Sequence, residues 1–231
     1  KGTGVPLAKV AALCMVGKML PELGYVSDPV ARYVAVKESV FPFARFSGVD
    51  VILGPEMKST GEVMGIASDF PSAFAKSQIA AGVRFPPPGE AVFLSVKDDD
   101  KPAVVDLARR LRALGYRVVA TRGTRAYLGG KGVQTEEVLK VAEGSPNIVD
   151  LICAGGIGMV INTTAGKREI ADSFSIRRQA LMHGVPYFTT VQAARMAVGA
   201  LEALARQKLD YKPLQDLLKP NGHGASVRAT A

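Results

Sequence analysis

The 231-residue sequence contains no tryptophan and only two cysteines and two histidines. Without CxxC, HExxH or clustered Cys/His patterns, it predicts no metal site. No nucleophile with an adjacent base can be assembled from the sequence, so we expect no catalysis in this chain. A Gx4GK[ST] loop is missing, and Gly54, Gly61 and Gly65 do not fit the GxGxxG spacing. The usual nucleotide-binding signatures are therefore absent.

Long apolar runs are also absent. Hydrophobic residues make up 48% of the chain, yet no run reaches the ~18 residues that a membrane span needs, so we expect a globular protein without membrane contact. The start, residues 1–6, lacks the features of a secretory signal and resembles the interior of a longer chain. Cys14 and Cys153 lie in apolar stretches, which predicts buried, reduced thiols in a reducing compartment.

The net charge of +8 suits nucleic acid, acidic membranes or small anionic ligands. Lysine and arginine are spread along the chain. Their densest groups, Arg109–Arg112 and Arg177–Arg178, fall in amphipathic helices whose charged faces we expect to be solvated. Aromatic stacking platforms and a recognition helix are lacking, so nucleic acid is not an expected partner. Tight, salt-dependent oligonucleotide binding would be the mark of that alternative.

A proline-rich stretch over residues 80–89 divides the chain, because three consecutive prolines neither join a sheet nor continue a helix. We predict a segment 1–82, a linker 83–89, a domain 90–209, and a tail 210–231 that is disordered beyond Leu218. The elements predicted in the first segment are a helix over Val5–Leu20, strands over Tyr33–Phe41 and Gly61–Ile66, and a helix over Phe70–Ile79. So small a segment buries little surface, which indicates a missing preceding part.

The second segment alternates strands with helices. The predicted strands are Ala91–Val96, Tyr116–Ala120, Val138–Val141, Gly158–Asn162 and Pro186–Thr189. The predicted helices are Lys101–Leu114, Thr124–Leu128, Ile148–Ala154, Ile170–His183 and Ala193–Gln207. This alternation predicts an α/β fold with a doubly wound, mainly parallel five-stranded sheet.

Two predicted strand ends carry similar polar turns, Thr121–Thr124 and Asn162–Lys167. Each offers hydroxyl groups, a glycine and free N–H groups at a helix start, an arrangement that suits a phosphate. Ligands of open parallel sheets bind at the carboxyl ends of the strands. The alternative is that these side chains only cap the following helices. Because the turn occurs twice, we favour an anion site.

Further side chains lie within reach of the same crevice in the predicted fold. Lys101 and Lys140 would strengthen a phosphate site, although solvated lysines remain the alternative. Asp172 and Ser173, one turn into a predicted helix, are placed to meet a ribose or a base edge, or to lie on exposed helix surface.

Two motifs indicate a family. The run GTGVPLAKV over Gly2–Val10 and the run LGPEMKSTGEVMG over Leu53–Gly65 resemble the large subunit of carbamoyl-phosphate synthase, at the end of its second ATP-grasp unit. The following segment resembles the regulatory domain at that subunit's C-terminus, which has the methylglyoxal-synthase-like fold. The resemblance runs from Lys1 to Leu209. It implies a remnant of a synthetase unit over 1–82 and an allosteric domain over 90–209.

The resemblance also implies nucleotide effectors, UMP or IMP. The matching contact positions are Ser95, Lys101, Thr121, Thr124, Lys140, Asn162, Thr163, Thr164 and Ser173. Both polar turns and both lysines belong to this set. Arg122 stands where many relatives have a smaller or imidazole side chain, so the resemblance does not fix base selectivity.

An ornithine site is implied at Glu38, Tyr187 and Thr189. A diamino acid needs carboxylates for its ammonium groups, and Glu38 supplies one. The other ligands of the family site precede Lys1, and Pro186 and Phe188 replace more polar residues of some relatives. We therefore expect weak ornithine binding.

For the whole enzyme, the resemblance implies a ligase that makes carbamoyl phosphate from bicarbonate, glutamine-derived ammonia and ATP for pyrimidine and arginine synthesis. ATP and Mg²⁺ or Mn²⁺ would bind before Lys1, so no cofactor is expected in this segment. The implied partners are the remainder of the large subunit and a glutaminase small subunit. A cytoplasmic location is expected, or the plastid stroma, since residues 70–82 are similar to plant and algal relatives.

One alternative function uses the same fold. A stand-alone methylglyoxal synthase eliminates phosphate from a triose phosphate with a carboxylate base in a Gly-Gly-Asp motif. This chain has Glu143-Gly-Ser-Pro-Asn147 there, so the catalytic aspartate is missing, although Glu143 is close by.

Overall fold

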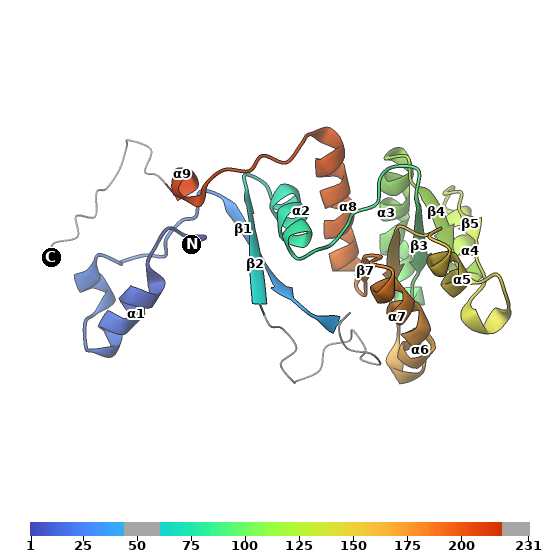
Figure 1. The fold of residues 1–231 in the computed structure, drawn as a ribbon, viewed down its shortest axis with the longest axis horizontal. Helices are drawn as coiled ribbons and strands as arrows, with labels where there is room; N and C mark the ends of the chain where they lie inside the picture. The colour runs from blue at the N-terminus through green and yellow to red at the C-terminus, as the bar shows by residue number, and fades with distance from the viewer. Residues whose placement is uncertain (44–60, 219–231) are drawn as a thin grey trace.

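The computed structural model describes residues 1–43 and 61–218 (Figure 1). An antiparallel hairpin and its covering helix lie beside a five-stranded parallel sheet flanked by helices. Residues 53–60 of the motif that carried the resemblance, and the tail predicted to be disordered beyond Leu218, lie outside the described residues.

The large sheet has the order β5-β4-β3-β6-β7, and every pairing in it is parallel. Its strands are β3 (Ala91–Ser95), β4 (Arg117–Ala120), β5 (Glu136–Glu137), β6 (Met159–Asn162) and β7 (Tyr187–Phe188). The chain leaves β3 toward β4 and β5, then returns to the other side of β3 for β6 and β7. This confirms the predicted doubly wound fold, and the strand order reverses beside β3.

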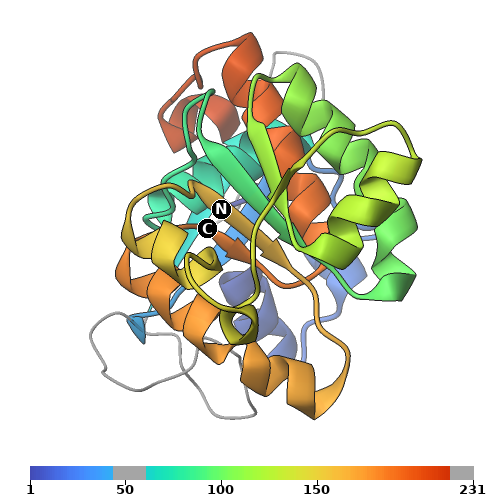
Figure 2. The same cartoon turned by 90° about the vertical axis from the view of Figure 1, so that its right-hand side faces the viewer.

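Helices cover both faces of this sheet (Figure 2). They are α3 (Lys101–Ala113), α4 (Arg122–Gly130), α5 (Ile148–Cys153), α6 (Gly166–Asp172), α7 (Phe174–Met182) and α8 (Val191–Arg206). Alternate side chains of β3 enter different cores, as the pleat requires. Val92 and Leu94 pack with residues of α3 and α8, whereas Phe93 packs with residues of α5 and α7.

The hairpin pairs β1 (Val34–Val40) with β2 (Gly61–Ala67) in antiparallel register. Helix α2 (Phe70–Ala80) begins at Asp69, whose carboxylate accepts a hydrogen bond from Ser72 N, and it packs on both the hairpin and α8. A short helix, α9 (Leu214–Leu218), follows the last long helix. The two predicted segments are therefore in direct contact through α2 and α8.

The first predicted helix is shorter than expected. Helix α1 covers Leu7–Met15, and a separate 3-10 turn follows at Leu20–Leu23. Gly17 interrupts the run because its φ of 94° is left-handed. None of the residues of α1 is buried.

Two other predicted elements were wrong in detail. The third strand forms at Glu136–Glu137 and not over Val138–Val141, because only Val138 of that apolar run is buried and a charged strand is well suited to a sheet edge. The long helix over Ile170–His183 is two helices. The Ser173 hydroxyl donates to the Glu169 carbonyl, a local bond that competes with helix continuation, and α6 ends there.

Predictions for three side chains were also wrong. Cys153 is exposed, with its Sγ 3.6 Å from Gln179 Oε1, and Cys14 is half-buried. Arg177 is only 3% exposed, and its guanidinium donates to the Ile170 carbonyl. In each case the apolar or charged neighbours in the sequence do not decide which side of a short helix faces inward.

No helix within residues 1–43 and 61–218 combines the length and apolar character that crossing a membrane requires.

We predict that Gly65→Ala destabilises the hairpin against α2. A Cβ at Gly65 would meet the Ala73 carbonyl and lie 2.6 Å from Ser77 N, so backbone would have to move. We expect a loss of about 1–3 kcal/mol in the free energy of unfolding, measured by chemical denaturation. Gly61→Ala, in the same strand, meets no atom within 4 Å and is the matched control. Equal stability of the two variants would contradict this close approach.

We also predict that Glu202→Gln weakens the contact between α3 and α8. Arg110 donates from Nε and Nη2 to the two Glu202 oxygens at 2.7 and 2.8 Å, and this lowers the pKa of Glu202. A lowered folded-state pKa stabilises the fold above the unfolded pKa of about 4.3, and this stabilisation is lost as pH falls through the folded value. We expect Glu202→Gln to lower the free energy of unfolding by about 1 kcal/mol at pH 7, and by less in acid, as measured by chemical denaturation at each pH.

The control for that change is Glu136→Gln. Its partner Arg117 is 56% exposed, against 30% for Arg110, so solvent screens the pair and we expect a smaller effect. Equal losses for both variants, or a loss at Glu202 that does not depend on pH, would exclude a special role for the Arg110 pair.

Candidate functional site

A cavity of about 770 Å³ opens at the carboxyl ends of β3, β4 and β6. Its walls come from the turns that follow these three strands and from the starts of the helices after them. In a doubly wound sheet this edge, where the strand order reverses, is the place for a ligand. The volume falls within the range of about 300–1,000 Å³ for small-molecule sites. We call it the strand-end cavity.

All the residues that the resemblance marked as nucleotide contacts line this one cavity. They are Ser95, Lys101, Thr121, Thr124, Lys140, Asn162, Thr163, Thr164 and Ser173. They come from positions up to 78 residues apart in the sequence, and the sheet brings them together.

The first polar turn is held by its hydroxyl groups. Thr121 and Thr124 are 4% and 2% exposed. Val96 N donates to Thr124 Oγ1 at 3.3 Å, and the Thr121 hydroxyl lies 3.4 Å from the same oxygen. Although Thr121 stands at the N-cap of α4, its side chain accepts no capping hydrogen bond. The capping alternative is therefore wrong at this turn.

The second polar turn is organised in the same way. Lys97 N donates to Thr163 Oγ1 at 3.2 Å, and the Asn162 amide donates to Tyr187 Oη at 2.7 Å. The N-cap of α6 is Ala165, so neither side chain caps that helix. Both turns thus bind the chain that leaves β3.

The two lysines differ in their surroundings. Lys101 begins α3, its side chain is 18% exposed, and its Nζ lies 2.6 Å from Asp98 Oδ1 and above Gly123 at the start of α4. Lys140 is exposed at the rim, and no ion pair recorded for the described residues involves it. Lys101 therefore points into the cavity, and the alternative of a solvated lysine does not hold for it.

Of the two helix residues proposed to reach a ribose or a base, Ser173 is buried at the cavity wall. Its hydroxyl donates to the Glu169 carbonyl at 2.8 Å. The side chain of Asp172 lies outside the described side chains.

The predicted ornithine residues come together only in part. Tyr187 and Thr189 line a second cavity of about 660 Å³ beside α7. Glu38 is not among its lining residues. The Glu38 carboxylate accepts a hydrogen bond from Gln78 at 2.7 Å, and burial raises its pKa. This α7 cavity shares Asn162 and Thr164 with the strand-end cavity.

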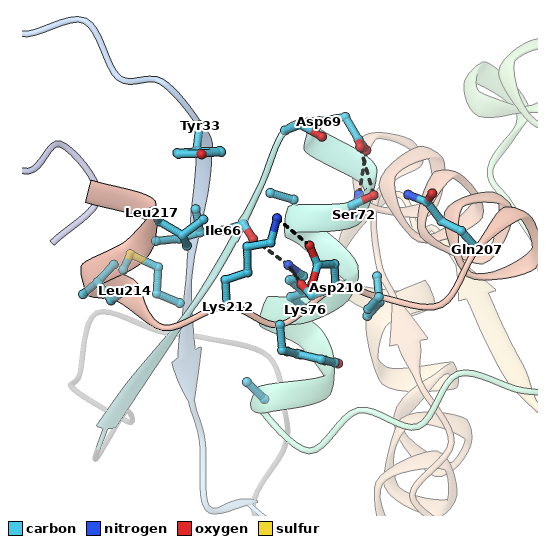
Figure 3. A pocket seen from close by; sticks show the side chains of 16 residues that line it. Tyr33, Ile66, Asp69, Ser72, Lys76, Gln207, Asp210, Lys212, Leu214 and Leu217 are labelled. Carbon is cyan, nitrogen blue, oxygen red and sulfur yellow. Dashed lines mark hydrogen bonds and ion pairs between the residues drawn. The ribbon is translucent and has the colours of Figure 1, made fainter. Parts of the chain in front are cut away.

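A third cavity, of about 500 Å³, lies between the hairpin, α2 and the segment before α9 (Figure 3). Lys76 is its central cation. It donates to the carbonyls of Ile66 and Asp210 and lies 5.4 Å from the centre of the Tyr211 ring. Lys212 pairs with Asp210 at 2.9 Å. Because these charged groups already bind one another or the backbone, we interpret their contacts as holding the segment before α9 against α2 and the hairpin.

Four charged residues that line the strand-end cavity, Lys97, Asp98, Asp99 and Glu169, were not expected there from the sequence. The acidic run at Asp98–Asp100 was assigned only to the helix start, where it does form a 3-10 turn. No sequence pattern marks Glu169, which reaches the cavity from the first turn of α6.

Known proteins share sequence similarity with this chain. Residues 103–189 match the MGS-like domain family. Carbamoyl phosphate synthase large chains of Myxococcus xanthus, Xanthomonas campestris and Archaeoglobus fulgidus are 69%, 54% and 47% identical to this chain over 99%, 87% and 94% of it. A methylglyoxal synthase structure from Elizabethkingia anophelis is 17% identical with a TM-score of 0.37, covering 62% of this chain and 98% of its own.

The chain spans only 21%, 19% and 20% of the length of those three large chains. The similarity nevertheless extends over nearly the whole of this sequence, hairpin and parallel sheet alike. The chain therefore belongs to the family of carbamoyl phosphate synthase large chains, of which it carries the MGS-like domain and the segment before it.

Proposed function

We propose that this chain is the regulatory region of a carbamoyl phosphate synthase large chain, and that its strand-end cavity binds the phosphate of a nucleoside monophosphate, UMP or IMP. The observation that carries the proposal is the convergence of two lysines and two polar turns on one cavity. Each of these features is also recognisable in the sequence alone.

The chemistry of the cavity suits an anion. Lys101 begins α3, and its Nζ lies beside Gly123 at the start of α4, where the helix dipole also favours negative charge. Lys140 adds a second cation to the lining of the cavity. The threonine hydroxyls are engaged with backbone N–H groups, so they fix the turn and leave the remaining N–H donors to meet phosphate oxygens. Asn162 and Ser173 then face the nucleoside.

Regulation requires that the nucleotide prefer one state of the enzyme over another. The wall shared by the two cavities offers a physical route. A ligand that draws Asn162 toward the strand-end cavity weakens its bond to Tyr187, and so alters the α7 cavity, where we place weak ornithine binding. The contact of α2 with α8 extends this route to the hairpin.

The whole protein's activity is part of the same proposal. It would be a ligase that uses ATP with Mg²⁺ or Mn²⁺ bound outside this segment, together with a glutaminase partner. Helix α1 would face the rest of the large chain, because Leu7, Met15 and Val16 are 58–87% exposed and an apolar helix of this kind calls for a covering surface.

We predict submillimolar binding of UMP or IMP to the 231-residue chain, measured by calorimetry. Lys101→Ala and Lys140→Ala each remove a charged hydrogen-bond donor, worth about 1.5–3 kcal/mol, so we expect about 10- to 100-fold weaker binding. Lys9→Ala removes the same charge from α1, outside the three cavities, and is the control. Unchanged binding in both cavity variants would place the site elsewhere.

We predict that the chain forms no methylglyoxal from dihydroxyacetone phosphate. The chain has Glu143-Gly-Ser-Pro-Asn147 where methylglyoxal synthases carry Gly-Gly-Asp, and Asn147 Oδ1 accepts from Val149 N at 2.9 Å to cap α5. Glu143 is engaged with Lys140 N. Methylglyoxal production that disappears in Glu143→Gln would instead favour the stand-alone enzyme.

A further inference from the structure

Acidic side chains occupy some of the donors that the proposed phosphate would use. The first is Asp98, whose carboxylate lies 2.6 Å from Lys101 Nζ. Its side chain is 91% exposed, so water is freely available to it, and it nevertheless bonds to the lysine. The hydrogen bond from Lys101 lowers the pKa of Asp98, so the carboxylate is charged at neutral pH.

The second is Glu169 in α6. One of its carboxylate oxygens accepts a hydrogen bond from Ala165 N, in the turn that follows β6. Glu169, Ala165, Asp98 and Lys101 all line the strand-end cavity. Two independent contacts, one after β3 and one after β6, thus place a carboxylate on a donor of the same cavity.

We propose that Asp98 and Glu169 are internal competitors of the ligand, and that together they set the affinity and charge preference of the cavity. This inference rests on the proposed function of the cavity as a phosphate site. A phosphate reaches Ala165 N only by displacing Glu169, since this single N–H is already bonded. At Lys101 it competes with Asp98 for an ammonium group that has three N–H donors, one of them already directed at the carboxylate. A phosphate monoester carries two charges and three free oxygens, so one molecule can replace both.

A singly charged ligand forms weaker interactions with these donors than a doubly charged phosphate monoester does. It offsets one displaced carboxylate and leaves the other in place, beside the bound anion. The cavity therefore prefers a doubly charged monoester to a diester. In the absence of ligand, Asp98 also balances the charge of Lys101 and keeps its ammonium group in place.

A substitution of the neighbouring Asp99 distinguishes direct competition for a donor from a general effect of negative charge on affinity. Asp99 also lines the cavity and carries the same charge. Within the described part of the chain, no ion pair or hydrogen bond is recorded for its carboxylate, unlike that of Asp98. Asp99→Asn changes the net charge of the cavity as much as Asp98→Asn does, without freeing a donor.

The test is calorimetry of the 231-residue chain with inorganic phosphate, UMP and dimethyl phosphate at constant ionic strength. The variants are Asp98→Asn, Glu169→Gln, their combination, and Asp99→Asn. Glu169→Gln keeps an oxygen that can accept from Ala165 N, so the start of α6 is preserved. Exposed ion pairs are worth up to about 1 kcal/mol, which corresponds to at most about fivefold in affinity.

We expect Asp98→Asn and Glu169→Gln each to tighten phosphate and UMP binding about two- to fivefold, and the combination to approach the product. Asp99→Asn should change affinity less than either. The preference for inorganic phosphate over dimethyl phosphate should narrow in the combined variant. Equal tightening by Asp99→Asn, or weaker binding in the two contact variants, would overturn the inference.

The same experiment distinguishes failure of the proposed function from failure of the competition between carboxylates and ligand. If the unaltered chain binds neither phosphate nor UMP, but the combined variant does, internal competition is supported and the natural affinity is lower than proposed. If the combined variant also binds neither, both the phosphate site and the competition are overturned.

Discussion

Two backbone hydrogen bonds at the end of β3 determine the shape of the candidate site. The N–H groups of Val96 and Lys97, the first two residues after the strand, donate to Thr124 and Thr163. One threonine follows β4 and the other follows β6, so the chain leaving the central strand is bound on both sides. The ends of β3, β4 and β6 are consequently held together, and the cations and the remaining N–H donors of the strand-end cavity lie around them.

This arrangement explains why threonine is suited to both turns. A buried hydroxyl must find a partner, and here it satisfies an N–H group that the strand ladder does not use. Thr121 stands at the N-cap of α4 without a capping hydrogen bond, and its hydroxyl lies 3.4 Å from Thr124 Oγ1. Two carboxylates bind groups of the same cavity: Asp98 pairs with Lys101, and Glu169 accepts a hydrogen bond from Ala165 N. A ligand enters by exchange with these internal groups.

Much of the fold could be predicted from the sequence because buried parallel strands are written as continuous apolar runs, as in Ala91–Ser95, whose first four residues are buried. The edge strand Glu136–Glu137 could not be predicted, since its two exposed glutamates show neither alternation nor β-branching. The break at Ser173 depends on one local hydroxyl bond, and the exposure of Cys153 on the orientation of a six-residue helix. Such details are decided by tertiary packing.

The site divides in a similar way. Thr121 and Asn162 could be placed from the sequence because they follow strands whose ends meet at one sheet edge. Asp98 and Glu169 could not, because their roles depend on side-chain conformations and on the short turn of α6. The position of Glu38 against Gln78, away from Tyr187 and Thr189, likewise depends on how α2 packs on the hairpin.

The central claim is that a nucleoside monophosphate occupies the strand-end cavity. Amide chemical shifts of the isotopically labelled chain, titrated with UMP, test it most directly because they locate the ligand without any substitution. We predict the largest changes at Val96, Lys97, Gly123 and Ala165, with little change at Lys76 and Tyr211 around the third cavity. Changes centred on Lys76 and Tyr211, or none at millimolar UMP, would contradict it.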